Sequence, residues 1–464
     1  MNSCLRTSRA HRSSPGPGLM FRLRKSNLIP WIFIILPFFI DQIDGFIFEE
    51  FQQELPISKI YKTPLLLFSI GFVLIFSSER KYKIWLSVFM LFVLISQLVS
   101  TLYAQPTLDT LLTDFGHLLK IFAFPILYFF FMTYFRTIPL PSFNAIKKLY
   151  LFLFFSFSAA IIFSFFGFGI PFYGYTKEGE SIGQQGYFIS GNAISAFYLL
   201  ISSIFYFIII RSRHVLLLFA GGTLSIMIGL LMGSKTAILS SILCFIGVYV
   251  ANKIYEKKTF TVNKSDTVFL ISITGFIIFG IIFFERILDT INPIYRNYSY
   301  RYRMSDTFLD FITNGRVYRA AFEMNYFAMK LPLPQMLFGR GYSHYQSVNV
   351  PNTKFSSAEI DFIDILHIAG FVGVLLIYSF WFYLWYRVLK NFLSGKHEIS
   401  ISLLIALSVL ILNSNLSGHI IHSALLNLNL AFLAAYAMTI NRPSPTGPQT
   451  LENRQSNPLR DSGP

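Results

Sequence analysis

Residues 356–386, SSAEIDFIDILHIAGFVGVLLIYSFWFYLWY, begin with polar side chains and continue as an apolar run long enough to cross a lipid bilayer. A helix needs about 20 apolar residues to span roughly 30 Å of hydrocarbon. Such runs recur along the 464 residues, of which 54% are hydrophobic and 13% are charged. A soluble protein of this length cannot bury so much apolar surface. The sequence therefore predicts an all-α, polytopic integral membrane protein.

The apolar runs predict twelve membrane spans, at residues 28–47, 63–78, 84–103, 111–135, 149–170, 188–210, 215–233, 236–252, 267–284, 362–386, 399–415 and 419–440. They form a membrane domain over residues 28–440. A basic tail (1–27) precedes it, and a tail rich in Pro, Ser and Asn (441–464) follows it. Both tails are expected to be disordered.

Lys and Arg gather in alternate loops, which predicts the orientation because cytoplasmic loops are enriched in these residues. The basic tail, the carboxyl tail and five loops hold most of the 38 Lys and Arg residues; these loops contain residues 80–83, 136–148, 211–213, 253–264 and 387–396. Twelve spans then leave both termini in the cytoplasm, in a bacterial inner membrane. This topology accounts for the net charge of +15, so we expect no nucleic-acid partner.

Two cysteines and the short inner loops limit the chemistry that the chain can perform. Cys4 lies in the basic tail and Cys244 lies within an apolar run, so neither a disulfide nor a thiolate metal site is expected. No phosphate-binding glycine loop or nucleotide-sugar motif is present, and we expect no cofactor. His419 and His422 are spaced as metal ligands can be, but capping or substrate hydrogen bonds explain them better than a metal.

One loop, residues 285–358, is much longer than the others and is predicted to be periplasmic. It is rich in Tyr and Arg, which favours an ordered lid or substrate platform over a simple connector. At its end, Glu359, Asp361, Asp364 and His367 crowd into nine positions at the outer mouth of the tenth span. Ser356-x-x-Glu359 also fits a helix-capping box. That interpretation leaves the other three unexplained, and ionisable groups at this depth usually serve function.

Cations predicted on the outer side could accompany these acids. Each has a plain structural alternative: an arginine on the surface, an ammonium reaching the interface, or a buried lysine paired with an acid. Together they suit a diphosphate, because guanidinium groups pair with phosphate oxygens and remain charged. A nearby carboxylate suits deprotonation of a sugar hydroxyl. The candidates are Lys235, Arg286, Arg316 and, as second choices, Arg319, Arg340 and Lys120.

Three short motifs and the large outer loop before the tenth span resemble the bacterial O-antigen polymerases and the related O-antigen ligases. The motifs are GYFISGNAIS (186–195), GSKTAILS (233–240) and NGRVYRAAFE (314–323) followed by FGRGYSHY (338–345). In the ligases, a His and a polar residue stand nine residues before Gly-x-x-Gly. Here Glu359 occupies the His position ahead of Gly370, which favours a polymerase.

The resemblance implies a GT-C-like glycosyltransferase that joins oligosaccharides carried on undecaprenyl pyrophosphate, in lipopolysaccharide or other surface-polysaccharide biosynthesis. Glu359 would act as the base, and Asp361 and Asp364 would assist. The cations, with His367 and His419, would bind sugar and diphosphate. A chain-length regulator and a flippase are the expected protein partners. An O-antigen ligase and a lipid-linked oligosaccharide flippase or other transporter are the alternatives.

Overall fold

The computed structural model describes residues 28–53, 57–104, 107–172, 183–212, 214–256, 315–347, 358–395, 398–416, 418 and 420–440, with parts of 292–313. Regular secondary structure in these residues is helical, apart from one isolated bridge between Pro171 and Gln184. The predicted all-α class is therefore confirmed for this part of the chain. The predicted tails, 1–27 and 441–464, lie outside it.

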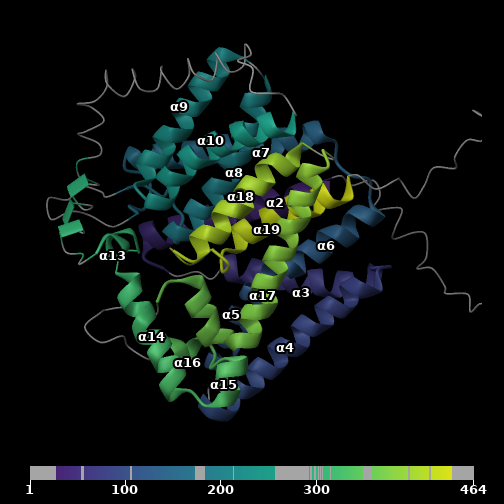
Figure 1. The fold of residues 1–464 in the computed structure, drawn as a ribbon, viewed down its shortest axis with the longest axis vertical. Helices are drawn as coiled ribbons and strands as arrows, with labels where there is room; N and C mark the ends of the chain where they lie inside the picture. The colour runs from purple at the N-terminus through teal and green to yellow at the C-terminus, as the bar shows by residue number, and fades with distance from the viewer. Residues whose placement is uncertain are drawn as a thin grey trace, which may run out of the picture.

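The helices, labelled as in Figure 1, are α2 (Leu28–Phe51), α3 (Ile57–Phe76), α4 (Arg80–Ala104), α5 (Leu108–Ile121), α6 (Ala123–Thr137), α7 (Phe143–Phe165), α8 (Gly191–Ser212), α9 (Val215–Met232), α10 (Lys235–Tyr255), α13 (Phe308–Thr313), α14 (Arg316–Lys330), α15 (Leu333–Phe338), α16 (Tyr342–Ser347), α17 (Asp361–Leu393), α18 (Ile399–Ser414) and α19 (Ala424–Thr439).

Six of these helices are long and apolar enough to cross a membrane: α2, α4, α7, α8, α10 and α17. The pair α5 and α6 passes the same test when taken together, which raises the number to seven. Several such helices in one chain support a multi-pass membrane protein. The predicted number of twelve crossings stays a prediction.

The predicted span 111–135 is not one straight helix. It is divided into α5 and α6, which meet at Phe122 with a bend of 57°. Pro125 lies in the first turn of α6, where its missing N–H does no harm, whereas in a continuous helix its ring would clash with the carbonyl of Ile121. The proline therefore favours a new helix start at this point.

Four predicted spans coincide with helices whose apolar part is shorter than a full crossing: Ile60–Phe76 of α3, Leu216–Met232 of α9, and the helices α18 and α19. The helices α18 and α19 have 16 residues each, against about 20 for a perpendicular span. The predicted span 267–284 lies outside the described residues.

The centre of the molecule is formed by α6, α8 and α19, whose side chains are buried on nearly every side. The helix α19 packs along α6, and α8 packs against α10 and α18. A helix that is apolar on all sides belongs in a core. Buried hydroxyl groups in α8, such as those of Ser202 and Ser203, donate to carbonyls of the same helix.

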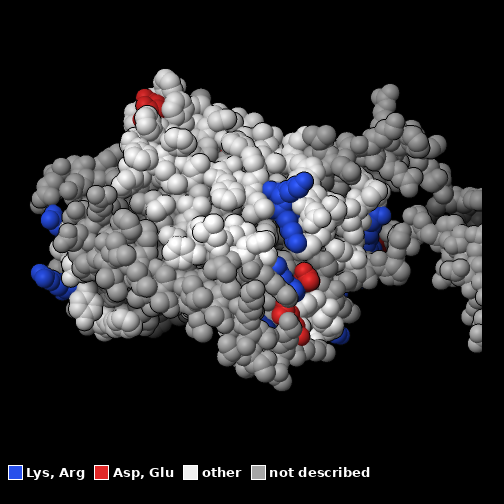
Figure 2. Space-filling model, turned by 90° about the horizontal axis from the view of Figure 1, so that it is seen from above, with Lys and Arg blue, Asp and Glu red and all other residues white. Residues whose placement is uncertain are grey.

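Around this centre, the outer helices present large apolar side chains on the surface. Ile75, Leu102 and Leu216 are strongly exposed. In the view of Figure 2, the Lys, Arg, Asp and Glu side chains of the described residues form small groups among uncharged residues. An exposed apolar surface of this extent fits contact with lipid rather than with water.

The described parts of the predicted large loop include the short helices α13, α15 and α16 and the longer α14. In Figure 1, α15 and α16 lie beside α4, α5 and α17, and α14 runs from them toward α13. The helix α15 contacts both α17 and α4, and α16 contacts α5 and α17. The end of this loop is therefore a folded cap over the start of α17.

Candidate functional site

The site begins where the chain enters α17. Glu359 has a φ of 55°, and Ile360 is the cap residue of the helix, which starts at Asp361. A capping box requires its Glu inside the first turn. Glu359 lies before the helix, so the capping-box interpretation is wrong. The positive φ of a non-glycine residue is uncommon and marks a specifically held backbone.

The Glu359 carboxylate lies against two guanidinium groups of α14. Its Oε2 accepts hydrogen bonds from Nη2 of Arg316 at 3.1 Å and from Nη2 of Arg319 at 3.2 Å. Both arginine side chains are buried, whereas the Glu359 side chain remains 22% exposed. Arg316 also donates to the carbonyl of Thr313. The structure thus brings together three of the predicted site residues, with the carboxylate as their accessible member.

One face of α14 accounts for this arrangement. Its buried residues are Arg316, Arg319, Glu323 and Phe327, at intervals of three and four that follow the helix period. A helix that buries three ionisable side chains on one face must provide each with partners. Glu323 was not predicted as a site residue, although its place in this repeat was visible in the sequence.

Glu323 forms the centre of a second, fully buried cluster. Its Oε2 lies 3.3 Å from Nη2 of Arg340 and 3.3 Å from Nε2 of His367, and none of the three side chains is exposed. Burial raises the pKa of Glu323 to about 7, while the Arg340 guanidinium opposes that shift. Burial also lowers the pKa of Arg340. The rings of Tyr326 and Tyr345 flank the guanidinium at 4.6 and 5.1 Å.

The segment carrying Arg340 docks on a break in α17. Gly370 has φ 68° and ψ −177°, so the helix is interrupted there. The backbone N–H groups of Arg340 and Gly341 donate to the carbonyls of His367 and Ile368 at 2.9 and 3.3 Å. A Cβ on Gly370 would clash with the carbonyl group of Leu337. The glycines of the 339–341 segment and Gly370 of α17 therefore allow the two backbones to come into direct contact.

Asp364 and Asp361 are both buried and both hold neighbouring chain segments. Asp364 Oδ1 accepts a hydrogen bond of 2.6 Å from the hydroxyl of Tyr345, which in turn accepts from the N–H of Ala358. Asp361 Oδ2 accepts from the backbone N–H groups of Ile420 and Ile421 at 2.9 and 3.0 Å. These contacts give the two carboxylates positioning roles around Glu359.

The loop that Asp361 holds leads into a pocket of about 360 Å³ whose lining includes several ionisable side chains. Lys120 lines this pocket together with Asp44, Lys62 and His422. Lys62 forms an ion pair of 2.5 Å with Asp41, another lining residue. His422 follows the two amides bound by Asp361, so the acid at the start of α17 connects to the pocket through one short segment. Lys120 therefore belongs to this pocket rather than to the Glu359 cluster.

The remaining predicted residues divide into two groups. Lys235 donates from Nζ to the carbonyl of Phe311 and lies over its ring; Phe311 is in α13, which packs on α14. Arg286 and His419 lie outside the described residues. Among the residues that the structure describes, no group of three or more His, Cys, Asp or Glu side chains is placed to hold a metal ion.

Chemically, the arrangement offers a partly accessible carboxylate beside two fixed cations, on a rigid support of buried ion pairs and hydrogen bonds. The guanidinium groups favour the charged carboxylate, the form that accepts a proton or a hydrogen bond. Their forks also match phosphate oxygens. The search of protein-family models, of curated proteins and of solved structures finds no match to this chain.

Proposed function

We propose that the protein is a membrane-embedded glycosyltransferase that polymerises oligosaccharide repeat units carried on undecaprenyl pyrophosphate, as in O-antigen or a related surface polysaccharide. The observation that supports this most is the Glu359 carboxylate, accessible and held between Arg316 and Arg319 at the end of an apolar helix. It joins a group that can take a proton to groups that can bind a diphosphate. The resemblance of the surrounding motifs to the polymerases points to the same substrates.

In the proposed reaction, a hydroxyl of the terminal sugar on one lipid-linked repeat unit attacks the anomeric carbon of the growing chain. The new glycosidic C–O bond forms as the C–O bond to the diphosphate breaks. Glu359 takes the hydroxyl proton, and undecaprenyl pyrophosphate leaves with the bonding electrons. Cationic side chains stabilise the charge that grows on that leaving group. The cations assigned to this role are Arg316, Arg319, Lys235 and Arg286.

The ion pairs of Glu359 suggest how proton transfer by this carboxylate is linked to diphosphate binding by the two arginines. A diphosphate carries more charge than a carboxylate, so an arriving donor substrate competes for the forks of Arg316 and Arg319. Once these arginines turn to the phosphates, the Glu359 carboxylate becomes available to the acceptor hydroxyl. We therefore assign the observed pairing to the resting site.

The buried residues receive supporting roles in this proposal. Arg340 and His367 share Glu323 and do not reach the surface, so they position the loop that covers α17. Asp361 and Asp364 hold the chain on either side of Glu359. Lys120, in the pocket that it shares with Asp44 and Lys62, is the candidate for contacts with the sugar or diphosphate of a substrate.

We also propose that the protein lies in a bacterial inner membrane, with Glu359 on the periplasmic side and both termini in the cytoplasm. This location rests on the alternation of basic loops. A chain-length regulator and a flippase would act on the same polysaccharide.

A lipopolysaccharide gel from a strain lacking this protein tests the function. The account expects core plus a single repeat unit, with the ladder restored by a plasmid copy of the wild-type gene. Bare core with accumulated lipid-linked polymer would make the protein a ligase. Bare core with single units trapped on the cytoplasmic face would make it a flippase, and an unchanged ladder would refute all three.

A further inference from the structure

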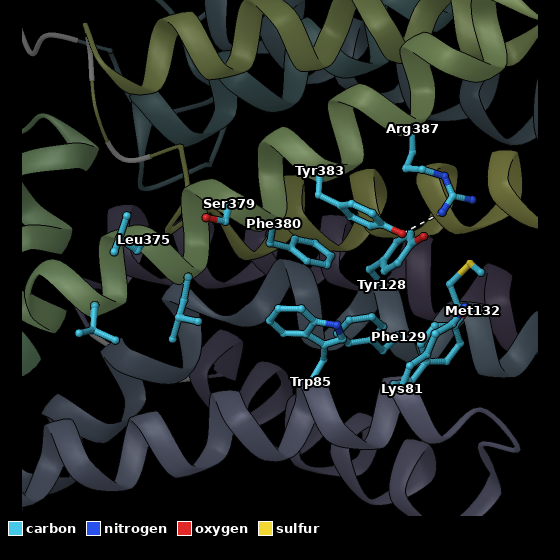
Figure 3. Close-up of a pocket in the computed structure, with 13 residues that line it drawn as sticks. Lys81, Trp85, Tyr128, Phe129, Met132, Leu375, Ser379, Phe380, Tyr383 and Arg387 are labelled. Atoms are coloured by element: carbon cyan, nitrogen blue, oxygen red, sulfur yellow. Dashed lines mark hydrogen bonds between the residues drawn. The ribbon is translucent and has the colours of Figure 1, made fainter.

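A second cavity, of about 550 Å³, lies between α4, α6 and α17 (Figure 3). The part of α17 that lines it runs from Val372 to Arg387, about 22 Å of helix at 1.5 Å per residue. Glu359 lies on the far side of the Gly370 break, about 28 residues before Arg387 in sequence. At this break α17 folds back, which brings the rings of Phe362 and Tyr378 to 6.0 Å. The cavity lining includes none of Glu359, Arg316 and Arg319, so the cavity is separate from their cluster.

The long walls of the cavity are apolar and aromatic. Phe129 of α6 and Phe380 of α17 form its inner wall, with ring centroids 5.7 Å apart. Trp85 of α4 and Leu375 of α17 line it as well, and each is 50% exposed. Because both helices are candidate membrane spans, an opening between them faces lipid. The shape suits a hydrocarbon chain that enters from the side.

One end of the cavity carries cations and phenolic hydroxyls instead. Figure 3 shows Lys81 and Arg387 at the end where Tyr383 and Tyr128 also point. Arg387 donates from Nη1 to the hydroxyl of Tyr383 at 2.8 Å, a neutral partner. Trp and Tyr prefer the level of lipid headgroups. This end therefore has the composition of a membrane interface.

Among the residues that the structure describes, the charges at this end do not balance. Glu79 is the carboxylate beside them: it lies 2.5 Å from Arg136 and 3.5 Å from Lys81. Lys81 is 60% exposed. One carboxylate, which pairs mainly with Arg136, thus lies beside three cations: Lys81, Arg136 and Arg387. The remaining positive charge lies at the head of an apolar groove.

We propose that this groove binds one anionic phospholipid, with its phosphate between Lys81 and Arg387 and an acyl chain along Phe380 and Leu375. Basic pockets between membrane helices bind anionic headgroups, and the apolar walls add the burial of a hydrocarbon chain. The residues that line the groove do not include Glu359 or the two arginines paired with it, so the lipid is a bound component and not a substrate of that site. By the alternation of basic loops, it lies in the cytoplasmic leaflet.

Titration of phosphatidylglycerol and phosphatidylcholine into the purified full-length protein, followed by native mass spectrometry, tests this proposal. We expect the wild type to prefer phosphatidylglycerol. The double variant Lys81→Gln/Arg387→Gln should bind it roughly 30-fold more weakly. This factor corresponds to a loss of about 1 kcal/mol of attraction to the headgroup for each cation. The matched variant Lys148→Gln/Lys330→Gln removes two exposed cations that do not line the groove and should bind like the wild type.

The apolar half of the groove has its own test. Ser379→Phe adds a ring inside the cavity and leaves both cations in place, so it should also weaken phosphatidylglycerol binding. Equal binding of both phospholipids, or unchanged binding in Lys81→Gln/Arg387→Gln, would overturn the proposal. Undecaprenyl phosphate that displaces phosphatidylglycerol at tenfold lower concentration would overturn the choice of lipid. Melting curves of each variant show whether a loss of binding reflects unfolding.

Discussion

Individual charged residues near the start of α17 differ in how much of their side chains is exposed to solvent. Glu359 keeps part of its side chain exposed, whereas Asp361, Asp364, Arg340 and Glu323 are buried with protein partners. A buried ion pair costs much of its own attraction in desolvation, and removing one partner leaves a charge uncompensated. We therefore assign chemistry to Glu359 and structural support to the others.

Glu323 predicts a pH effect on stability. Its pKa rises from 4.5 to about 7 on folding because of burial. Between these values the folded protein holds more protons than the unfolded chain, so raising the pH through this range destabilises the fold. The groups that face Glu323 are Arg340 and His367.

Melting temperatures of the detergent-solubilised wild type and Glu323→Gln, measured from pH 4.5 to 8, check this effect. The stability of the wild type relative to Glu323→Gln should fall as the pH rises to about 7 and then level off. If the stability of the wild type relative to Glu323→Gln instead rises with pH, or stays constant, the raised pKa of Glu323 is contradicted.

Residue types and spacing predicted that acids and outer cations belong together, and the contact of Glu359 with Arg316 and Arg319 agrees with that. The sequence did not predict which cation pairs with which acid. Arg340 was assigned to diphosphate, but its guanidinium is enclosed with Glu323 and two tyrosines. Such pairing depends on how α14 and the 338–345 segment dock on α17, which no local pattern specifies.

At the scale of elements, the break in α17 decides how the cap over the site is held. The carbonyls of His367 and Ile368 lose helical partners at Gly370 and gain the amides of Arg340 and Gly341 instead. Buried backbone groups need such partners. The glycines at 339 and 370 make this possible, because a Cβ at either would clash with the other segment.

Gly370→Ala should therefore destabilise the protein. Its φ and ψ lie in a region that is essentially restricted to glycine, and strain of this kind costs about 1–3 kcal/mol before any clash. The melting temperature of Gly370→Ala should drop clearly. Gly71→Ala is the control, since Gly71 lies in α3 and a methyl group added there would meet nothing within 4 Å; it should melt at or above the wild-type temperature. Equal melting of both variants would show that the break is not needed.

Hydrophobic runs located the described helices, because burial in lipid depends on composition and length. They missed the bend between α5 and α6, where Pro125 was the available signal. They also could not show that Gly370 interrupts α17. A glycine is tolerated within a helix, and only the docking of residues 339–341 makes its special φ necessary.

At the scale of the whole molecule, ion pairs join loops that the charge alternation places on the same side. Arg136 pairs with Glu79, and Arg211 pairs with both Glu256 and Glu398, all in or beside loops predicted to be cytoplasmic. Residues that meet in space cannot lie on opposite sides of a bilayer, so these pairs support the predicted topology.

Labelling of single cysteines tests that topology. In a full-length chain with Cys4→Ser and Cys244→Ser, Met329→Cys and Leu393→Cys introduce thiols at two exposed positions, in α14 and at the end of α17. A membrane-impermeant maleimide added to spheroplasts should label Met329→Cys at once. It should label Leu393→Cys only after the membrane is permeabilised. Labelling of both without permeabilisation would contradict a membrane-crossing α17.

The most direct measurement of the central claim is glycosyl transfer by the purified full-length protein in vesicles containing an undecaprenyl-pyrophosphate-linked repeat unit. We predict that the wild type forms a ladder and that Glu359→Gln slows it about 10²–10⁴-fold, the usual contribution of a general base. Glu50→Gln, which changes an exposed carboxylate hydrogen-bonded to Tyr187, should match the wild type. Polymerisation by well-folded Glu359→Gln at the wild-type rate would contradict the account.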